Sequence, residues 1–226
     1  MQIEQHQTHL REHASLLADA EKHALVWIAR RMPAWINADH LTVLGLVSMV
    51  MGGAAYWAAS RNRIALLFVV VALALNWFGD SLDGTLARIR NHQRPRYGWY
   101  VDHVIDIVGT SCLLGGLALS SYMEPLVALG LLAAFMMLEA EVFLATHVNG
   151  VFRLSFMKLS PTELRIILSL GTVMLFYKPY VRIFGAGPYR LFDVGGIVSI
   201  IGLIFVLAVS AIRNTCTLYK AERIPR

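Results

Sequence analysis

Six apolar runs constrain this chain more than any other sequence feature, because each is close to the ~20 residues that a helix needs to cross a bilayer. Hydrophobic residues make up 57% of the 226 positions and charged residues only 15%, whereas a soluble domain carries about a quarter charged residues. A soluble fold could not cover these runs, so the sequence predicts an all-α integral membrane bundle of six transmembrane helices. The runs span residues 41–59, 64–82, 101–120, 125–146, 164–181 and 194–212.

The segment before the first run has the pattern of an amphipathic helix over residues 10–36. Apolar Leu17, Leu25 and Ile28 fall on one side of this helix, and Asp19 and Lys22 fall on the other. A helix of this kind often lies in the membrane interface, although a plain soluble lead-in helix is the alternative. We therefore expect residues 1–36 to form an interfacial, amphipathic juxtamembrane helix and residues 37–226 to form the six-span domain.

The distribution of basic residues predicts the orientation of the chain. If the N-terminus is cytoplasmic, 15 of the 20 Lys and Arg lie on the cytoplasmic side: four before the first run, four between the second and third, three around the start of the fifth, and four after the sixth. This bias predicts a multi-pass protein with both termini in the cytoplasm, in a bacterial inner membrane. The pI of about 9.4 does not indicate nucleic-acid binding, because the basic residues bracket apolar runs and form no single face. Membrane lipids are the expected partners of these residues.

Four aspartates lie within or beside the second and third runs. Asp80 and Asp83 are three residues apart and share one helix face, and Asp102 and Asp106 are four apart and share a face of the next helix. Because a short loop joins the two helices, we expect antiparallel neighbours whose acidic faces meet. Small residues on the same faces would let a bulky ligand approach the backbone: Gly84, Ala87 and Gly98.

Such a cluster of acids needs cations. An aspartate at the centre of a transmembrane helix costs about 2.5–3.5 kcal/mol, mutual repulsion adds to this, and Arg88 can pair with only one carboxylate. Hard divalent cations prefer oxygen ligands, and two such ions form a clamp on transferring phosphoryl groups. A carboxylate-lined ion or metal transporter is an alternative from a different class. The sequence predicts two Mg2+ or Mn2+ ions at Asp80, Asp83, Asp102 and Asp106.

The spacing of these residues resembles the signature of the CDP-alcohol phosphotransferases, also called CDP-alcohol phosphatidyltransferases. In that signature, two aspartates separated by two residues are followed by Gly, Ala-Arg, a spacer, a second Gly, and two further aspartates at four-residue steps. The spacer here, residues 89–97, is one residue longer than usual, which leaves the helix faces unchanged. Every fixed position is present: Asp80, Asp83, Gly84, Ala87, Arg88, Gly98, Asp102 and Asp106.

This resemblance implies a transferase of phospholipid biosynthesis. Family members move the phospho-alcohol part of a CDP-linked donor to an acceptor hydroxyl and release CMP. The resemblance implies that Asp80, Asp83 and Asp102 hold metal, and that Asp106 holds metal and acts as the catalytic base. CDP-diacylglycerol is the expected donor, and a CDP-aminoalcohol with diacylglycerol as acceptor is the alternative. The resemblance also implies a homodimer, and a CDP moiety bound by Gly84, Ala87, Arg88 and Gly98.

A weaker resemblance precedes the first run, in residues 37–42 (NADHLT). Many family members carry Thr-Pro-Asn or Thr-Pro-Asp here, followed by a Thr near the nucleotide, and Asp39 and Thr42 match these positions. Both residues are therefore candidates for binding the CDP moiety. Asp39 could instead, or in addition, cap the N-terminus of the first membrane helix, for which its side chain is suited.

The acceptor alcohol is left open by the sequence, because its contacts fall outside the shared motif. Arg94, Glu163 and Arg165 are candidates, since some family members place an acid and an arginine at the start of the fifth span. The alternatives are a topology signal for Arg94 and a capping box over residues 160–163 for Glu163. Glu139 and Glu141 lie inside the fourth run, where at least one needs a polar partner within the bundle.

Aromatic prenyltransferases are a rival enzyme class, since they also combine acidic motifs with magnesium in a membrane. They need more spans and a second acidic motif far along the chain. Here the acids lie within residues 80–106, and no later cluster follows. The sequence therefore favours a CDP-alcohol transferase.

Overall fold

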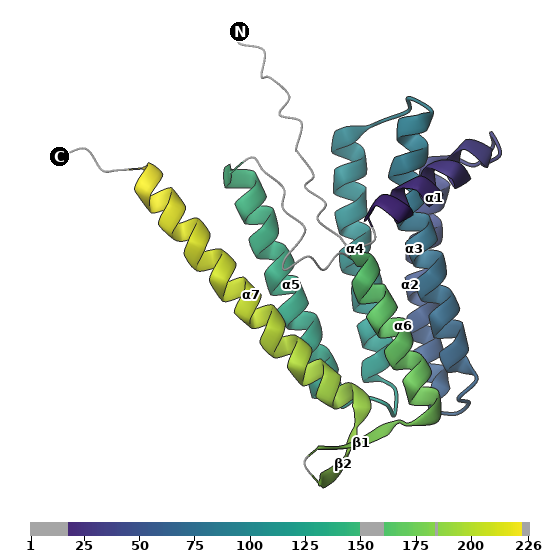
Figure 1. Cartoon of the computed structure of the whole chain (residues 1–226), viewed down its shortest axis with the longest axis vertical. Helices are drawn as coiled ribbons and strands as arrows, with labels where there is room; N and C mark the ends of the chain where they lie inside the picture. The colour runs from purple at the N-terminus through teal and green to yellow at the C-terminus, as the bar shows by residue number, and fades with distance from the viewer. Residues whose placement is uncertain (1–17, 150–160, 184, 223–226) are drawn as a thin grey trace.

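The computed structural model describes residues 18–149, 161–183 and 185–222, and consists of helices and one short β-hairpin (Figure 1). The turn between α3 and α4 and the end of α7 lie at one end of the bundle, which we call the motif end; the hairpin lies at the opposite, hairpin end. The elements are α1 Ala18–Arg31, α2 Ala38–Ala59, α3 Ala65–Ile89, α4 Pro95–Ala118, α5 Pro125–Asn149, α6 Pro161–Tyr177, β1 Tyr180–Ile183, β2 Ala186–Arg190 and α7 Leu191–Ala221.

Among the described residues, five helices are long and apolar enough to cross a membrane: α2, α3, α4, α5 and α7. The helix of the fifth run, α6, has 17 residues and is shorter. It ends at Tyr177, before the predicted end at 181, because Pro179 cannot continue a helix and residues 180–183 pair with β2. A helical membrane bundle with five candidate spans is therefore confirmed, and a crossing by α6 stays a prediction. The β1–β2 hairpin is an addition to the predicted all-α architecture.

Helix α2 packs against both α3 and α4, and glycines bring the backbones together. A Cβ atom on Gly79 would lie 2.5 Å from the carbonyl oxygen of Leu41, and one on Gly116 would clash with the backbone of Gly53. Helices α3 and α4 make few direct backbone contacts with each other. The glycines draw both helices mainly to α2, and the acidic faces of α3 and α4 nevertheless meet as expected: Asp83 lies within electrostatic range of Asp102, and Asp106 within range of Asp80.

The main core lies toward the hairpin end, between α2, α3, α4 and α6. Its fully buried members include Leu66, Val69 and Leu117. The hydroxyl groups of Tyr56 on α2 and Thr172 on α6 are also fully buried and lie 2.6 Å apart. This hydrogen bond satisfies both polar groups and holds α6 against the bundle.

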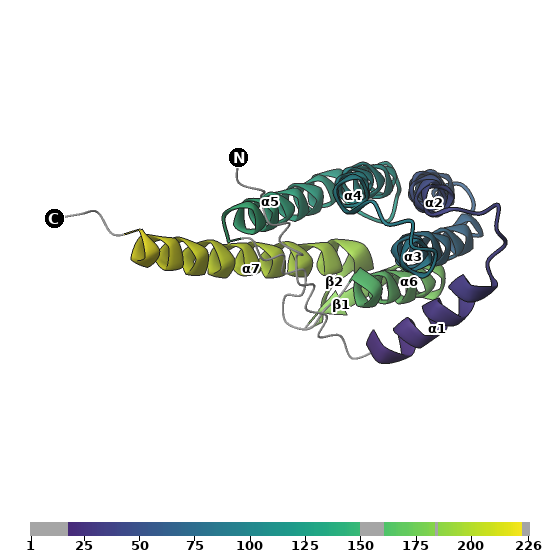
Figure 2. The same ribbon diagram turned by 90° about the horizontal axis from the view of Figure 1, so that it is seen from above.

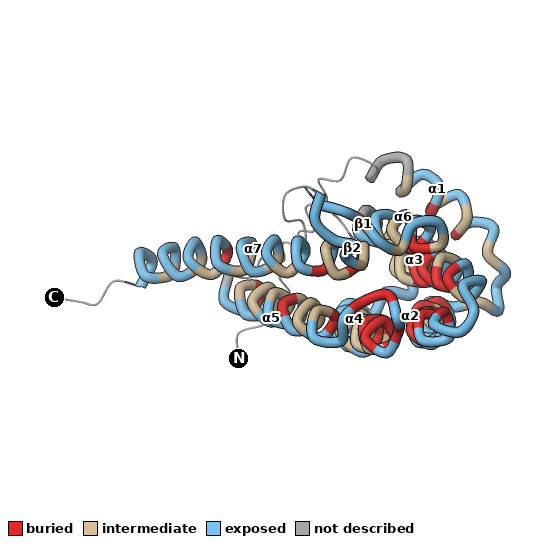
Figure 3. Tube along the Cα trace, turned by 90° about the horizontal axis from the view of Figure 1, so that it is seen from below, coloured by how far each residue is buried: buried red, intermediate tan, exposed pale blue. Residues whose placement is uncertain are grey.

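Helices α5 and α7 form a pair that leans away from the other helices toward the motif end (Figures 1 and 2). In the most apolar 18-residue stretch of α5 and of α7, only 11% of the residues are buried in protein, against 39% in α2 and in α3. Figure 3 shows the exposed residues along α7. Within the pair, Glu141 accepts hydrogen bonds from Ser210 and Asn214, both at 2.8 Å. The polar partner expected for a glutamate of the fourth run is confirmed.

Helix α1 runs past α3 and α6, on the side of α3 that faces away from α2 (Figure 2). Its apolar residues Leu25 and Ala29 are buried against Leu41, Leu82 and Leu86. It occupies residues 18–31 of the predicted 10–36, since the chain leaves the helix before Pro33; residues 10–17 lie outside the described part. The placement of α1 in a membrane interface stays a prediction.

Candidate active site

Two helices carry the four aspartates to the motif end. Asp80 and Asp83 lie in the last turns of α3, and Asp102 and Asp106 lie in the first half of α4. Helix α4 begins at Pro95, six residues before the predicted run, because proline has the right φ for a first helical position. Residues 90–94 make the turn between the two helices.

Asp83 is buried, with 7% of the residue exposed, and its carboxylate is held from two sides. The hydroxyl of Thr42 on α2 donates to Oδ2 at 2.7 Å, and the backbone N–H of Gly84 donates to Oδ1 at 2.5 Å. Thr42 therefore lies next to the aspartates. The end of the 37–42 segment thus belongs to the same site as the signature residues 80–106.

Asp80 and Asp106 lie at the meeting point of four helices. Arg165 on α6 donates to Oδ2 of Asp80 at 2.7 Å, and the side chain of this arginine is only 16% exposed. Asp106 is within electrostatic range of Asp80, Arg165, Glu139 and Asp102. Charged groups from α3, α4, α5 and α6 therefore converge here.

A divalent ion suits this donor set, because carboxylate oxygens are the ligands that hard cations prefer. In the described part of the chain, however, no three His, Cys, Asp or Glu side chains lie close enough together to surround an ion. The reason is visible in the hydrogen bonds, since Asp80 turns toward Arg165 and Asp83 toward Thr42. The aspartate oxygens are thus of the kind that binds a divalent metal, although Asp80 and Asp83 are hydrogen-bonded to Arg165 and Thr42.

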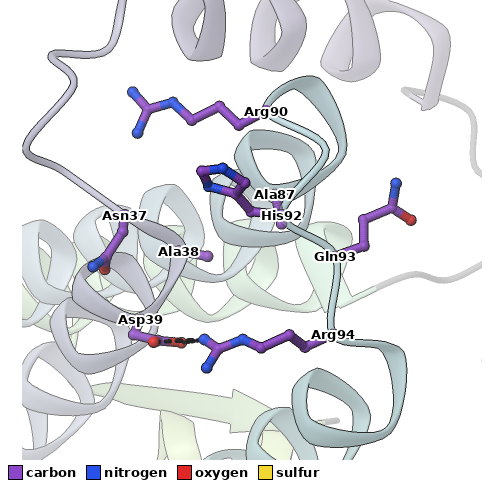
Figure 4. A pocket seen from close by; sticks show the side chains of 8 residues that line it. All are labelled: Asn37, Ala38, Asp39, Ala87, Arg90, His92, Gln93 and Arg94. Carbon is purple, nitrogen blue, oxygen red and sulfur yellow. Dashed lines mark hydrogen bonds and ion pairs between the residues drawn. The ribbon is translucent and has the colours of Figure 1, made fainter.

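A cavity of about 360 Å³ lies beside the turn between α3 and α4 (Figure 4). Asp39 and Arg94 face each other across one side of it, with Arg94 donating to both carboxylate oxygens at 2.5 and 2.6 Å. Hydrogen bonding to Asp39 raises the pKa of the Arg94 guanidinium above its ordinary value. Asp39 does not cap α2: the cap is Asn37, in a reciprocal capping box with His40, because Asn37 has the extended backbone of a capping residue.

Comparisons with known proteins decide the family. The family model for CDP-alcohol phosphatidyltransferases matches residues 35–210. The chain belongs to this family. It is similar to two solved structures of phosphatidylinositol phosphate synthase (PgsA1) from Mycobacterium tuberculosis. One, with CDP-DAG bound, has a TM-score of 0.66 and 17% identity, and the match covers 90% of this chain and 100% of that one. The other, in complex with manganese and citrate, has a TM-score of 0.64 and 18% identity, covering 89% and 93%. No curated protein matches the sequence.

Membership in the CDP-alcohol phosphatidyltransferase family identifies the protein as a membrane transferase of phospholipid biosynthesis, which transfers a phospho-alcohol group from a CDP-linked donor. The transporter and prenyltransferase alternatives are thereby excluded. The solved structures share the arrangement of helices with this chain. They confirm the membrane fold expected from the signature.

The signature residues expected to face the CDP moiety surround the end of α3. Ala87 lines the cavity together with Asp39, whereas Gly84 lies next to the Arg88 side chain. Arg88 is exposed and donates to the hydroxyl of Thr85 at 3.0 Å. A Cβ atom on Gly98 would meet no atom of the described residues within 4 Å, so packing among them does not require a glycine there.

The three candidate acceptor residues fall in different surroundings. Arg165 reaches the aspartates directly, through Asp80, whereas Arg94 is 55% exposed and pairs with Asp39 at the cavity. Glu163 lies in the first turn of α6, but its side chain is outside the described part. Glu139, an acid inside the fourth run, has a buried Oε2 with no hydrogen-bond partner among the described residues and lies near Asp106.

Two residues hold the surroundings of the site: Arg90, which the sequence offered only as a possible contact to substrate or lipid, and Glu21, which sequence reasoning missed. Arg90 donates to the carbonyl oxygens of Met32, Pro33 and Ile36, and so fastens the segment between α1 and α2 to the end of α3. Glu21 on α1 accepts hydrogen bonds from α3 and α6. A signal for Glu21 existed: it lies one turn before Leu25, within the apolar face of α1.

Proposed function

We propose that this chain is a metal-dependent phosphatidyltransferase that takes CDP-diacylglycerol as its donor and transfers the phosphatidyl group to an acceptor hydroxyl. Family membership supports the reaction class. The CDP-DAG bound to the similar mycobacterial synthase supports the donor. A CDP-aminoalcohol, with diacylglycerol as acceptor, is the alternative that a substrate comparison would distinguish.

One observation carries the proposal: Asp106 lies within electrostatic range of Asp80, Asp102 and Arg165, which belong to three helices. A carboxylate surrounded by other carboxylates and one guanidinium suits a site that binds cations and phosphates together. A transport path would need acids spread across the depth of the membrane, whereas Asp80, Asp83 and Asp102 lie toward the motif end and Asp106 lies no deeper than the middle of α4.

The reaction can be written with every atom accounted for. The acceptor oxygen attacks the phosphorus that carries diacylglycerol, and the bond from this phosphorus to the bridging oxygen breaks. CMP leaves with the bridging oxygen, and Asp106 takes the proton of the acceptor hydroxyl as general base. The other residues orient this base and the substrates.

Asp80, Asp83, Asp102 and Asp106 would hold Mg2+ or Mn2+, and we propose two ions. The hard oxygen donors of these residues support this, as does the manganese in the mycobacterial structure. When bound, the ions offset the charge of the diphosphate. Thr42 and the N–H of Gly84 orient Asp83.

We assign the CDP moiety to the cavity and the adjoining turn of α3. The guanidinium group of Arg88 can bind phosphate oxygens in pairs. Glycine at 84 and 98 leaves the backbone accessible, and Asp39 and Thr42 approach from α2. The residues assigned to the CDP moiety are Asp39, Thr42, Gly84, Ala87, Arg88 and Gly98.

We place the acceptor on the α6 side of the aspartates, near Arg165, with Glu163 and Arg94 as further candidates. Arg165 is the best supported of the three, because its guanidinium already lies 2.7 Å from Asp80. An acceptor bound there would have its hydroxyl near Asp106. The acceptor itself is to be identified by assay.

We further propose six membrane crossings, with α6 as the short one. Seventeen residues span roughly 25 Å at about 1.5 Å per residue. In Figure 1, α6 lies alongside α3 over the part of the bundle nearer the hairpin end, so its length and apolar sequence are what support a crossing. Six crossings leave both termini on the cytoplasmic side of a bacterial inner membrane. The exposed Trp27 and Trp35, at 58% and 75%, support an interfacial α1.

Two further proposals concern organisation. Residues 1–36 form the juxtamembrane segment and residues 37–226 the six-span domain, which the start of the family match at residue 35 supports. The protein forms a homodimer, as the resemblance to the family implies. Light scattering of the purified protein would test the dimer.

The deciding experiment is a CMP-release assay with purified protein, CDP-diacylglycerol and a panel of acceptors: inositol phosphate, glycerol phosphate, serine and aminoalcohols. We expect CMP release to depend on both a divalent metal and one of these acceptors. Release from a CDP-aminoalcohol with diacylglycerol, and none from CDP-diacylglycerol, would support the alternative donor. No CMP release from either donor with any acceptor would refute the proposal.

A further inference from the structure

A single carboxylate oxygen on α1 links three helices beside the aspartates. Oε1 of Glu21 accepts hydrogen bonds from Nε1 of Trp77 at 2.8 Å, from Oγ of Ser81 at 3.3 Å and from Oγ1 of Thr162 at 3.0 Å. Trp77 and Ser81 are one turn apart on α3, whereas Thr162 lies in the first turn of α6. Because hydrogen bonds to a charged acceptor are stronger than those between neutral groups, this oxygen is a strong link between α3 and α6.

The partners of Glu21 adjoin the site. Ser81 follows Asp80 in the chain, and Thr162 precedes Arg165 by three residues, about one helical turn. Arg165 donates to Asp80 at 2.7 Å. The link through Glu21 and the ion pair therefore join the same two helices, one turn apart.

The remainder of α1 is also fixed to the bundle. Its middle buries Leu25 and Ala29 against α2 and α3. After its end, Arg90 donates to the carbonyl oxygens of Met32 and Pro33 at 3.0 and 2.9 Å. With the middle of α1 and the segment after its C-terminal end attached, Glu21 has a defined position from which to hold α6.

An acid in the apolar face of a helix is costly unless its hydrogen bonds repay the cost. A helix that only lay in the membrane interface would carry its acids on the polar face, where water hydrates them, and would gain no stability from an acid on the apolar face. The three hydrogen-bond donors stabilise the Glu21 carboxylate on the apolar face of α1. Because these donors lie beside the aspartates, Glu21 is linked to the site.

We propose that Glu21 is a positioning residue for the transfer reaction. By accepting hydrogen bonds from Ser81 and Thr162, it sets α6 against α3 and so places Arg165 on Asp80. The proposal rests on the proposed function, in which Asp80 holds metal and Arg165 lies at the acceptor side. Helix α1 is then part of the catalytic unit as well as a membrane-surface segment.

A double-mutant cycle with Glu21→Ala and Thr162→Val tests this in the full-length protein. We expect each substitution to lower kcat/KM for CMP release by roughly fivefold to tenfold, and the pair to lower it little further, because both break one link. Glu21→Gln retains an acceptor oxygen and should restore most of the activity. Lys22→Ala, at the exposed neighbouring position, is the matched control and should behave like the wild type.

A second cycle separates positioning from stability alone. In an Arg165→Gln background, Thr162→Val should have little further effect on kcat/KM, although its effect on the melting temperature should be unchanged. Additive losses in either cycle, or wild-type turnover in Thr162→Val, would overturn the proposal. If Glu21→Ala does not fold, Thr162→Val still decides, because it removes one hydroxyl and keeps the shape. Absence of CMP release from the wild-type protein would refute the proposed function, whereas the cycles above test the role of Glu21.

Discussion

Thr42 on α2 donates a hydrogen bond of 2.7 Å to Asp83 on α3, although the two residues are 41 positions apart in the chain. Asp83 is buried, so its carboxylate cannot rely on water for hydrogen bonds. The second oxygen accepts from the N–H of Gly84. The buried aspartate of the signature thus has its orientation set by a residue from outside the signature.

Replacing Thr42 by valine should reduce turnover without unfolding the protein. Valine keeps the shape of the side chain and removes the hydroxyl, so the hydrogen bond to the Asp83 carboxylate is lost, at a cost of about 1.5–3 kcal/mol. We expect kcat/KM to fall by about tenfold or more. The control is Ser48→Ala on the same helix, whose hydroxyl donates to the carbonyl oxygen of Leu44, one turn earlier in α2. Equal losses in the two variants would count against a role for Thr42 in the site.

Asp106→Asn should abolish transfer and leave the protein folded. Asparagine has nearly the same size but cannot take the proton of the acceptor hydroxyl, and loss of a general base lowers rates by about 10²–10⁴-fold. CMP release measures the activity, and the melting temperature and elution profile in detergent measure folding. Near-normal turnover in this variant would remove Asp106 from the role of base.

Removal of divalent metal should stop CMP release. The aspartates of α3 and α4 repel one another, so cations are needed before a diphosphate can bind beside them. We expect EDTA to abolish activity and Mg2+ or Mn2+ to restore it, with each metal added in a titration. Full activity after extensive chelation would contradict a metal-dependent site.

Arg165→Gln should impair the enzyme more than a surface substitution would. In the ion pair with Asp80, 16% of the arginine side chain and 35% of the aspartate side chain are exposed, so removal of the arginine leaves a half-buried carboxylate without its cation. We expect kcat/KM to fall by at least roughly tenfold, with KM for the acceptor rising more than KM for the CDP-lipid. Arg182→Gln, on the exposed hairpin strand β1, provides the control. A rise confined to KM for the CDP-lipid would move Arg165 to the donor side.

Gly53→Ala should destabilise the bundle. A Cβ atom at this position would clash with the carbonyl group of Cys112 on α4, and backbone cannot move aside as a side chain can. Overpacking typically costs about 1–3 kcal/mol. Thermal unfolding in detergent should show a lower midpoint for Gly53→Ala than for Gly115→Ala, where the added atom meets nothing within 4 Å. Equal midpoints would mean that α2 and α4 can separate without cost.

The chemistry of the site was predictable from the sequence because helical periodicity is a local property. Spacings of three and four residues place Asp80 with Asp83, and Asp102 with Asp106, on single helix faces whatever surrounds them. The lengths of the apolar runs likewise predict membrane helices, and five of them are confirmed as candidate spans. The family follows from this pattern, and the match over residues 35–210 confirms it.

The partners of these aspartates were not predictable, because they come from distant parts of the chain. Asp80 pairs with Arg165 across 85 positions, and Asp39 pairs with Arg94 across 55. The sequence placed both arginines among acceptor candidates, but no local pattern distinguishes a buried arginine from an exposed one. Burial depends on which helices pack together.

By itself, the sequence determined that the chain enters a membrane, that its acids form two faces, and that these faces belong to a phospholipid transferase. Only the tertiary structure decided that α3 and α4 each pack mainly on α2, that Asn37 and not Asp39 caps α2, and that Glu21 ties α1 to α6. The physical reason is that helix faces follow from the spacing of neighbouring residues, whereas packing partners follow from close backbone contacts at glycines such as Gly53 and Gly79, which depend on the whole bundle.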